Sequence, residues 1–191
     1  MVDTRIVIVV DIFVVLLSLG AFWMTVGYGS GYDGFNAFDV ASMVGGYIGG
    51  QQVNPPSYQG AEFNAYAQAV LPPLMAGSWE VDAAIIALTT GLISAFFSFV
   101  RWRLSLLAGA LEVIGCLSWV AGISGISQEA GSKLAQWQGF NGVATPISVG
   151  SDVGTYIGAA GGVFLIATYL LTRTHRLDTP LDSSLPTPQV N

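Results

Sequence analysis

Four long apolar stretches, separated by polar and glycine-rich segments, set the pattern of this chain. They run over Ile6–Val26, Ala83–Val100, Leu104–Ile126 and Val153–Leu171. A helix needs roughly 20 apolar residues to cross about 30 Å of hydrocarbon, and each stretch is close to that length. The pattern therefore predicts an all-α integral membrane fold: a four-transmembrane-helix bundle that forms a single domain over residues 1–171, with a Pro- and Ser-rich cytoplasmic tail over residues 172–191.

The overall composition agrees with a membrane environment. The 191 residues are 52% hydrophobic and only 9% charged, whereas soluble proteins carry about 25% charged residues. The first stretch also resembles the apolar region of a secretory signal peptide. However, only Arg5 precedes it, offset by Asp3, and Asp11 interrupts it. These features favour a retained membrane helix over a cleaved leader.

The basic residues predict the orientation of the bundle. All but one of the six Lys and Arg residues lie in flanks that would share one side of the membrane. Because such residues are retained on the cytoplasmic side, both termini are predicted to be cytoplasmic in a multi-pass protein of the plasma membrane, with outer loops over residues 27–82 and 127–152. Lys133, in the second outer loop, is the exception. The predicted topology determinants are Arg5, Arg101, Arg103, Arg173 and Arg176.

Both outer loops are rich in glycine and aromatic residues. In the first loop, glycine predicts tight turns and a hairpin around "GGYIGG" at residues 45–50. The apolar spacing over residues 63–71 predicts a short helix that Pro72-Pro73 would stop. In the second loop, the apolar residues between positions 134 and 140 have helical spacing. Both loops are acidic, which disfavours nucleic acid as an outer partner.

Four tryptophans lie near the predicted membrane boundaries. Tryptophan is enriched at both membrane–water interfaces, where its amphipathic ring sits among the headgroups. We therefore interpret these residues as interfacial anchors rather than as stacking surfaces for a ligand. Three belong to the predicted outer boundary and the fourth to the inner one: Trp23, Trp79 and Trp137, and Trp102.

The fourth apolar stretch and its approach carry glycine at every fourth position. Residues four apart lie on one face of a helix, so the repeat predicts a smooth face on which another helix can pack closely. The pattern leaves open whether that helix belongs to the same chain or to another subunit. The repeat consists of Gly150, Gly154, Gly158 and Gly162.

Two carboxyl residues interrupt the apolar stretches, Asp11 in the first and Glu112 in the third. An unpaired charge is costly in an apolar medium, so both should face the bundle interior. Both fall in its cytoplasmic half, where they could meet and share a proton. A structural role, with hydrogen bonds from a polar stripe on the second stretch, and a proton or cation pathway are the two interpretations. The stripe consists of Thr90, Ser94 and Ser98.

The sequence contains no recognisable catalytic constellation. The single histidine, His175, lies in the tail, and the single cysteine, Cys116, lies in the third stretch. A Cys/His metal site or a bis-His haem site is therefore not expected. There is no GxxxxGK[ST] phosphate loop and no Ser-His-Asp set with its histidine near a pocket. We expect no catalytic residues, no metal and no cofactor.

The predicted layout of four spans, a long first outer loop and a shorter second loop is similar to that of claudin-like tetraspan proteins. Their first loop carries a Trp…Gly-Leu-Trp…Cys…Cys signature, which residues 27–82 lack. The resemblance is confined to the layout and assigns no family.

These features lead to one expected function and two alternatives. We expect a non-enzymatic structural or assembly component, or a small accessory subunit of a membrane complex. It would contact membrane lipids and form a homo-oligomer, or associate with other membrane-protein subunits, through the glycine face and the aromatic outer loops. The first alternative is a proton or cation channel or transporter that uses Asp11 and Glu112. The second is a quinone- or lipid-binding subunit of a respiratory complex.

Overall fold

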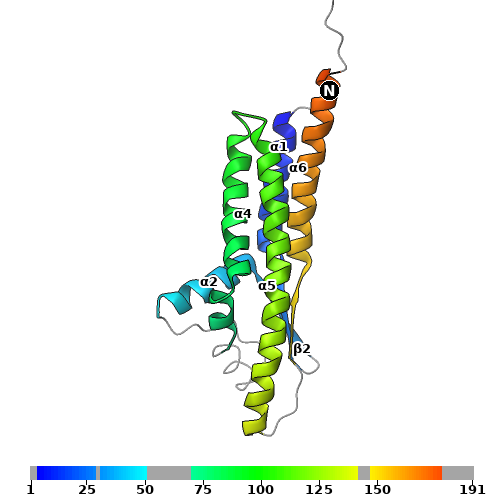
Figure 1. Cartoon of the computed structure of the whole chain (residues 1–191). Helices are drawn as coiled ribbons and strands as arrows, with labels where there is room; N and C mark the ends of the chain where they lie inside the picture. The colour runs from blue at the N-terminus through cyan, green and yellow to red at the C-terminus, as the bar shows by residue number, and fades with distance from the viewer. Residues whose placement is uncertain (1–3, 29–30, 51–69, 142–146, 178–191) are drawn as a thin grey trace, which may run out of the picture.

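The computed structural model describes residues 4–28, 31–50, 70–141 and 147–177, and it is mainly helical. Three of its helices are long and apolar enough to cross a membrane. The mainly helical fold and the presence of apolar helices of spanning length are confirmed. Figure 1 shows the order of elements: α1 (Thr4–Gly20), β1 (Phe22–Tyr28), β2 (Gly31–Asn36), α2 (Ala37–Ile48), α4 (Trp79–Phe97), α5 (Leu104–Asn141), β3 (Ile147–Ser151) and α6 (Val153–Leu177).

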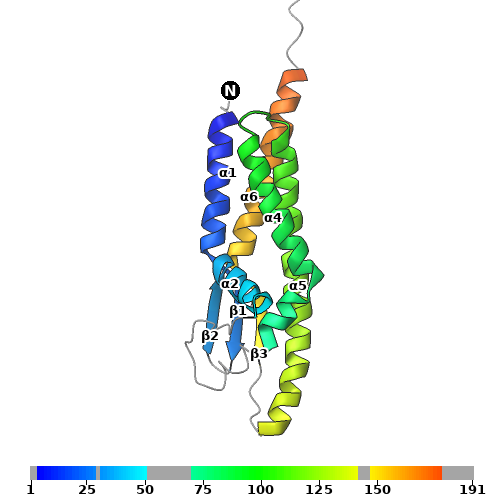
Figure 2. The same cartoon turned by 90° about the vertical axis from the view of Figure 1, so that its left-hand side faces the viewer.

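The four long helices α1, α4, α5 and α6 stand side by side along one axis (Figures 1 and 2). Going around the bundle, α4 packs on α5, α5 on α6 and α6 on α1, whereas α1 touches α4 sparsely. The start of α1, the α4–α5 turn and the end of α6 lie at one end, which we call the arginine end. The strands and α2 lie at the other, the sheet end. The two chain ends that the structure describes therefore share one side of the bundle.

The first predicted span is wrong at its outer end, because the helix stops at Gly20 and the chain continues as a strand from Phe22. The sheet has the order β2-β1-β3, and both pairings are antiparallel. Thr25 of β1 lies opposite Gly34 of β2 on one side and Gly150 of β3 on the other. The fold is therefore not purely α. The segment "FWMTV" is aromatic and β-branched, and strand pairing on both sides decides its conformation.

The first outer segment also differs from the prediction. The hairpin is formed by β1 and β2, whereas "GGYIGG" lies at the end of α2 and just after it. Asn36 and Asp39 form a capping box at the start of this helix: the Asn36 side chain accepts from the backbone N–H of Asp39 at 3.0 Å, and Asp39 accepts from that of Asn36 at 3.0 Å. A capping box supplies partners for the first N–H groups of a helix, which favours helix over turn here.

Pro72-Pro73 does not stop a helix, because the described chain is helical over residues 70–76 and both prolines lie within that segment. The rest of the predicted short helix, residues 63–69, lies outside the described residues. The segment ends at Gly77, and Ser78 then caps α4 by accepting a hydrogen bond from the backbone N–H of Val81.

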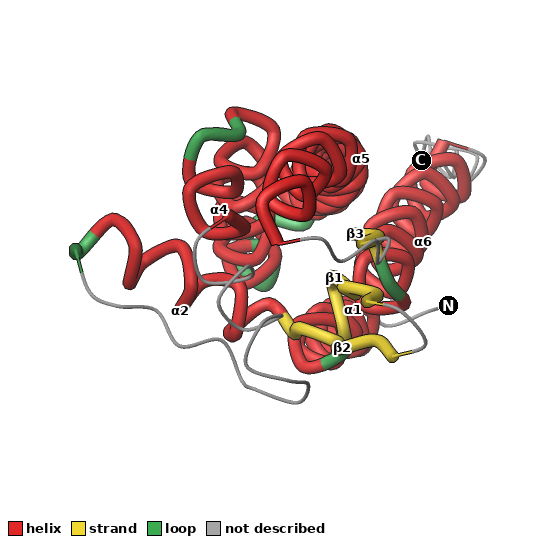
Figure 3. Tube along the Cα trace, turned by 90° about the horizontal axis from the view of Figure 1, so that it is seen from below, coloured by secondary structure: helices red, strands yellow, loops and turns green. Residues whose placement is uncertain are grey.

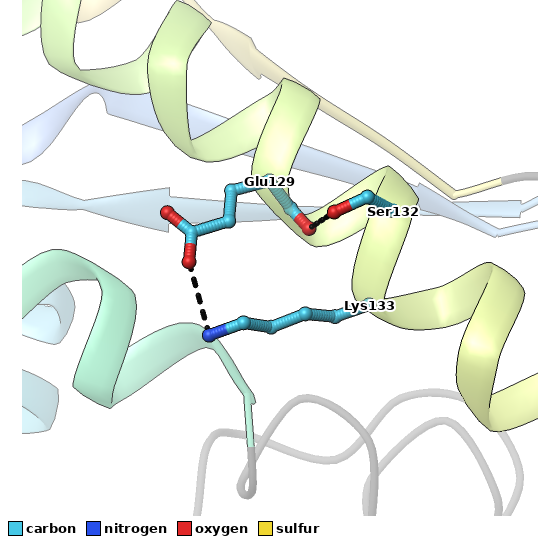
Figure 4. A network of polar contacts seen from close by, with 3 residues as sticks. All are labelled: Glu129, Ser132 and Lys133. Atoms are coloured by element: carbon cyan, nitrogen blue, oxygen red, sulfur yellow. Dashed lines mark hydrogen bonds and ion pairs between the residues drawn. The ribbon is translucent and has the colours of Figure 1, made fainter.

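The third predicted span continues far beyond Ile126, since α5 runs unbroken to Asn141. The backbone is helical over residues 134–140, in agreement with the helical spacing of the apolar residues there. The extension carries an exposed ion pair between Glu129 and Lys133, with 3.1 Å between Oε1 and Nζ, and the Ser132 hydroxyl donates to the Glu129 carbonyl at 2.8 Å (Figure 4). The extension of α5 therefore carries exposed polar side chains, unlike the apolar surface of the bundle.

The sheet end is joined to the bundle by one continuous apolar core. Figure 3, seen from below, shows the strands over the end of α1 and beside α6, with α2 running outward past α4. The core combines buried side chains from the sheet, from α2, from the 70–76 segment and from the outer halves of α4 and α5. Representative members are Val26, Phe35, Met43, Leu71, Met75, Val81 and Ile123. The outer part of the chain is therefore a platform fixed to the helices.

Candidate functional site

Asp11 lies at the centre of α1 and is fully buried, with 0% of its surface exposed. Its carboxyl faces α6: a Cβ atom placed on Gly161 would lie 3.7 Å from Oδ1 of Asp11. The neighbouring residues that point outward from α1, including Val10 and Phe13, are apolar and exposed. Asp11 therefore points into the bundle, as the sequence predicted.

Glu112 lies about 12 Å along α5 from its first residue, at the same depth in the bundle, and is 1% exposed. Its side chain lies between two glycines: Cγ would be 3.3 Å from a Cβ atom on Gly91 of α4, and its Cβ 3.0 Å from one on Gly162 of α6. Asp11 faces Gly161, the residue directly before Gly162 on α6. The structure thus places the two buried carboxyl residues against neighbouring positions of the same helix.

Within the described residues, none of the four carboxyl oxygens of Asp11 and Glu112 has a hydrogen-bond partner. The polar stripe on α4 does not supply one to either residue. Thr90 is exposed on the outside of the bundle, and the Ser98 hydroxyl donates to the carbonyl of Ser94 on its own helix at 2.8 Å. The interpretation that the stripe satisfies Asp11 is therefore wrong, and the carboxyl pair is left without a donor.

The glycine repeat faces other parts of the same chain. A Cβ atom on Gly162 would lie 2.7 Å from the Gly109 carbonyl oxygen on α5, and one on Gly109 would lie 2.6 Å from that of Gly162. A Cβ atom on Gly158 would lie 2.9 Å from the Ser18 hydroxyl. The backbones of α5 and α6 therefore touch, and the face is occupied within the chain. An intermolecular contact through these glycines, one of the expectations, is incompatible with this packing.

The other two glycines of the repeat lie outside the helix–helix contact. A Cβ atom on Gly154 would collide with the Trp23 ring, 2.5 Å from Cδ1. Gly150 belongs to β3, opposite Thr25, and its position is open enough for a side chain at ordinary contact distance. Gly150 therefore lies before α6 and does not belong to its helix face, although it continues the four-residue spacing.

Trp23 is the junction between the bundle and the sheet. Its indole N–H donates to the Ser18 carbonyl at 2.7 Å, and its own carbonyl accepts from the indole N–H of Trp119 at 3.0 Å. The two indole rings meet edge to face, with 5.5 Å between their centroids. Trp23 is buried, so its predicted role as an interfacial anchor is wrong.

A hydrogen bond also joins α1 to α6, because the Ser18 hydroxyl donates to the Gly154 carbonyl at 2.7 Å.

Two adjoining cavities lie between α1 and α4. The inner one, about 110 Å³, is lined by α1 and α4, with Glu112 and Gly158 from the other two helices. The outer one, about 200 Å³, extends from the same seam to α2. Residues that line both cavities are Leu19, Trp23, Leu88 and Thr89. Thr89 is also exposed on the bundle surface, so we treat the cavities as one groove, the α1/α4 groove, that opens sideways at this residue.

The predicted topology determinants gather at the arginine end. Arg5 lies in the first turn of α1, Arg101 and Arg103 lie in the α4–α5 connection, and Arg173 lies near the end of α6. Arg176 lies on the same helix, and its side chain is outside the description. A cavity of about 370 Å³ there is lined by aromatic, hydroxyl and guanidinium groups, and the Trp102 indole N–H donates to the Thr172 hydroxyl at 3.1 Å.

Sequence reasoning missed the α1/α4 groove and the role of Trp23. No local pattern marks either feature, because both depend on how helices and strands distant in sequence come together. Within the residues that the structure describes, there is no cluster of three or more His, Cys, Asp or Glu side chains that could hold a metal ion. No protein-family model matches the sequence, and no curated protein is significantly similar to it.

Proposed function

We propose that the chain is a four-span, multi-pass protein of the plasma membrane and acts as a non-enzymatic assembly component or accessory subunit. In this arrangement α1 is a span in addition to α4, α5 and α6. Its 17 residues are about 25 Å long, slightly less than the hydrocarbon thickness. A short apolar helix is accommodated by local thinning of the bilayer or by snorkelling of flanking side chains.

The distribution of polar residues across the bundle supports the fourth span. The outward-facing side chains of α1 are large and apolar, whereas its buried face carries Asp11 and Ser18. Acidic and hydroxyl side chains on the inside with Val, Leu and Phe on the outside suit a helix surrounded by lipid, since polar groups within membranes face the protein interior. The exposed apolar side chains of α1 are Ile6, Val9, Val10, Phe13, Leu16 and Leu17.

The proposed orientation places the arginine end in the cytoplasm. The support is the gathering of arginines from α1, the α4–α5 connection and α6 at that end. At the opposite end, the exposed Glu129–Lys133 ion pair belongs in water. Impermeant thiol labelling of intact cells should modify Ser132→Cys and spare Arg103→Cys, both in a Cys116→Ser background. The opposite pattern would contradict the orientation.

The observation that carries the assembly role is the apolar, aromatic surface of the sheet end. Large side chains stand exposed there on a platform whose core is continuous with the bundle. Exposed apolar surface held in a fixed position is typical of contact sites between proteins. Since the glycine face of α6 is occupied within the chain, the proposed contacts run through the outer platform. The exposed residues are Tyr32, Phe38, Tyr47, Ile48 and Trp79.

Native electrophoresis of mildly solubilised membranes tests this role. The doubly substituted Tyr32→Ser/Tyr47→Ser chain should migrate as a smaller species than the unsubstituted chain. The matched control is Ile86→Ala, which removes an equally exposed apolar side chain from the lipid-facing side of α4. If the platform variant migrates like the unsubstituted chain, or if Ile86→Ala dissociates it equally, the outer platform is not the contact surface.

A proton or cation pathway through Asp11 and Glu112 is the second candidate. The burial of two carboxyl residues against neighbouring positions of α6 favours it. The exposure of Thr90 argues against the polar route through α4 on which that candidate also depended. Asp11→Asn and Glu112→Gln should each reduce proton or cation flux into liposomes if the pathway exists, and flux equal to that of the unsubstituted protein would remove it.

A further inference from the structure

The α1/α4 groove is a place where the bundle leaves room that its own side chains do not fill. Apolar residues form its walls, from Leu19 and Trp23 through Leu88 to Phe38 on α2. Its inner end is different in character, because the buried Glu112 lines it there and neither Glu112 oxygen has a partner among the described residues. An apolar channel that ends on an unpartnered carboxyl has the form of a site for an amphiphile.

The carboxyl group at the inner end of the groove favours an amphiphile with a positively charged head group. No Lys, Arg or His occurs between Arg5 and Arg101 or between Arg103 and Lys133, so the chain offers no counter-ion at the depth of Glu112. Asp11 approaches the neighbouring position of α6: its Oδ1 would be 3.7 Å from a Cβ atom on Gly161, whereas Glu112 faces Gly162. An ionised carboxylate carries one negative charge and accepts several hydrogen bonds. A single ammonium group supplies both the opposite charge and three N–H donors.

A divalent metal ion fits this site poorly. Calcium takes six to eight oxygen ligands, and magnesium needs near-octahedral coordination. Glu112 lines the inner cavity, and the remaining lining is apolar apart from Ser18 and Thr89. The hydroxyl of Ser18 already donates to the Gly154 carbonyl. The apolar walls instead match a hydrocarbon chain.

We propose that the α1/α4 groove binds a single-chain amphiphile with a protonated primary amine, which enters sideways from the bilayer at Thr89. The ammonium lies against Glu112 at the inner end, and the chain runs past Leu88 and Trp23 toward α2. The two cavities are each smaller than the roughly 300–1,000 Å³ typical of pockets for drug-sized ligands, which restricts the ligand to one chain and a small head. The inference depends on the proposed transmembrane arrangement and is independent of the assembly role.

The test uses the full chain in lipid nanodiscs and a photoactivatable long-chain primary amine, with cross-linked peptides mapped by mass spectrometry. Labelling is expected on the groove walls, within residues 15–23 and 85–92. Dodecylamine should compete for the label about tenfold more effectively than dodecanol, a difference of about 1.4 kcal/mol, because only the ammonium forms a charge-assisted hydrogen bond with the carboxylate. Equal competition by the alcohol would overturn the assignment of an amine head.

Two pairs of variants make the result specific. Glu112→Gln and Asp11→Asn should each lower labelling about tenfold or more, while Glu112→Asp retains most of it. Thr89→Trp should block the groove, and the neighbouring Thr90→Trp is its matched control, since Thr90 is also exposed but lines neither cavity. Amine binding in the α1/α4 groove would be contradicted if labelling persisted in Thr89→Trp. It would also be contradicted if Thr90→Trp abolished labelling to the same extent.

The folded state of each variant is checked by its helical circular dichroism and its elution as a single species. If the Glu112 variants do not fold, the Thr89 and Thr90 pair decides the outcome. The thiol-labelling experiment on Ser132→Cys and Arg103→Cys is run on the same preparation. Absence of amine labelling in a chain with the proposed topology overturns this inference alone, whereas the wrong thiol pattern overturns the topology itself.

Discussion

The seam between α5 and α6 and the seam between α1 and α4 solve the packing problem in opposite ways. At the first, Gly109 and Gly162 face each other so closely that a Cβ atom on either would lie within 2.7 Å of the other's carbonyl oxygen. At the second, two cavities separate the helices, and a buried carboxyl stands without a partner at the inner one. The α5/α6 seam has no space for an added side-chain atom, whereas the α1/α4 seam contains unfilled volume.

The difference separates a closely packed seam that stabilises the bundle from a loosely packed one that carries the proposed ligand site. Lipid tails are as apolar as the helix surfaces, so helix association in a membrane depends on close contact and interhelical hydrogen bonds. The α5/α6 seam and the Ser18–Gly154 hydrogen bond between α1 and α6 provide both. The α1/α4 seam is packed loosely, and the buried Glu112 lines its inner cavity; a carboxyl buried within a membrane is costly and commonly marks a functional site.

The largest expected effect is at the tight seam. Gly162→Ala should destabilise the protein by about 1–3 kcal/mol, because the added methyl group collides with the backbone of α5, which cannot rotate away. Thermal unfolding in detergent measures the loss. The matched control is Gly125→Ala on α5, where nothing lies within 4 Å of the added atom and the change should be neutral or stabilising by up to about 1 kcal/mol. Equal destabilisation by both would show that the close contact is absent.

Glu112→Gln is expected to act in two directions. It removes a carboxyl group that is buried without a partner, so the ligand-free protein should gain about 1 kcal/mol of stability. At the same time it should lose amine binding. Thermal unfolding with and without dodecylamine measures both effects, because a bound ligand stabilises the folded state. The account would be contradicted if Glu112→Gln lowered the unfolding temperature of the ligand-free protein and dodecylamine still raised that of the variant.

Ser18→Ala tests the hydrogen bond that ties α1 to α6. We expect a loss of about 1 kcal/mol, since the Ser18 hydroxyl and the Gly154 carbonyl are buried and bonded at 2.7 Å. Ser132→Ala is the control, because its hydroxyl donates to a carbonyl in the same way but on the exposed extension of α5. That change should shift the unfolding temperature little. If both substitutions changed the unfolding temperature equally, the Ser18–Gly154 hydrogen bond would not stabilise the protein more than the exposed bond of Ser132.

The smallest expected effect is at the loose seam. Thr89→Leu adds volume at a position that lines both cavities, and the groove has room for it. The free energy of unfolding should therefore change by no more than about 0.5 kcal/mol, as for a surface substitution. Thermal unfolding again measures the effect. A loss as large as that of Gly162→Ala would mean that the two seams are packed alike.

The sequence predicted the helices of the bundle well, because a long apolar run is a local signal. It also placed Asp11 and Glu112 in the same half of the bundle, which follows from the rise of a helix. It failed at Phe22–Tyr28, where an apolar run continues but strand pairing with β3, more than 100 residues later, takes over. The orientation of the glycine face, the burial of Trp23 and the α1/α4 groove all depend on packing between distant segments, which no local pattern records.

Labelling by a small apolar diazirine dissolved in the bilayer tests the central contrast most directly. The full chain in nanodiscs is irradiated, and modified residues are located by mass spectrometry. The account predicts modification of Leu88, Thr89 and Glu112, which line the groove open to lipid, and none at Gly109 or Gly162, where the backbones of α5 and α6 touch. Modification at the glycines with an unlabelled Glu112 would contradict it.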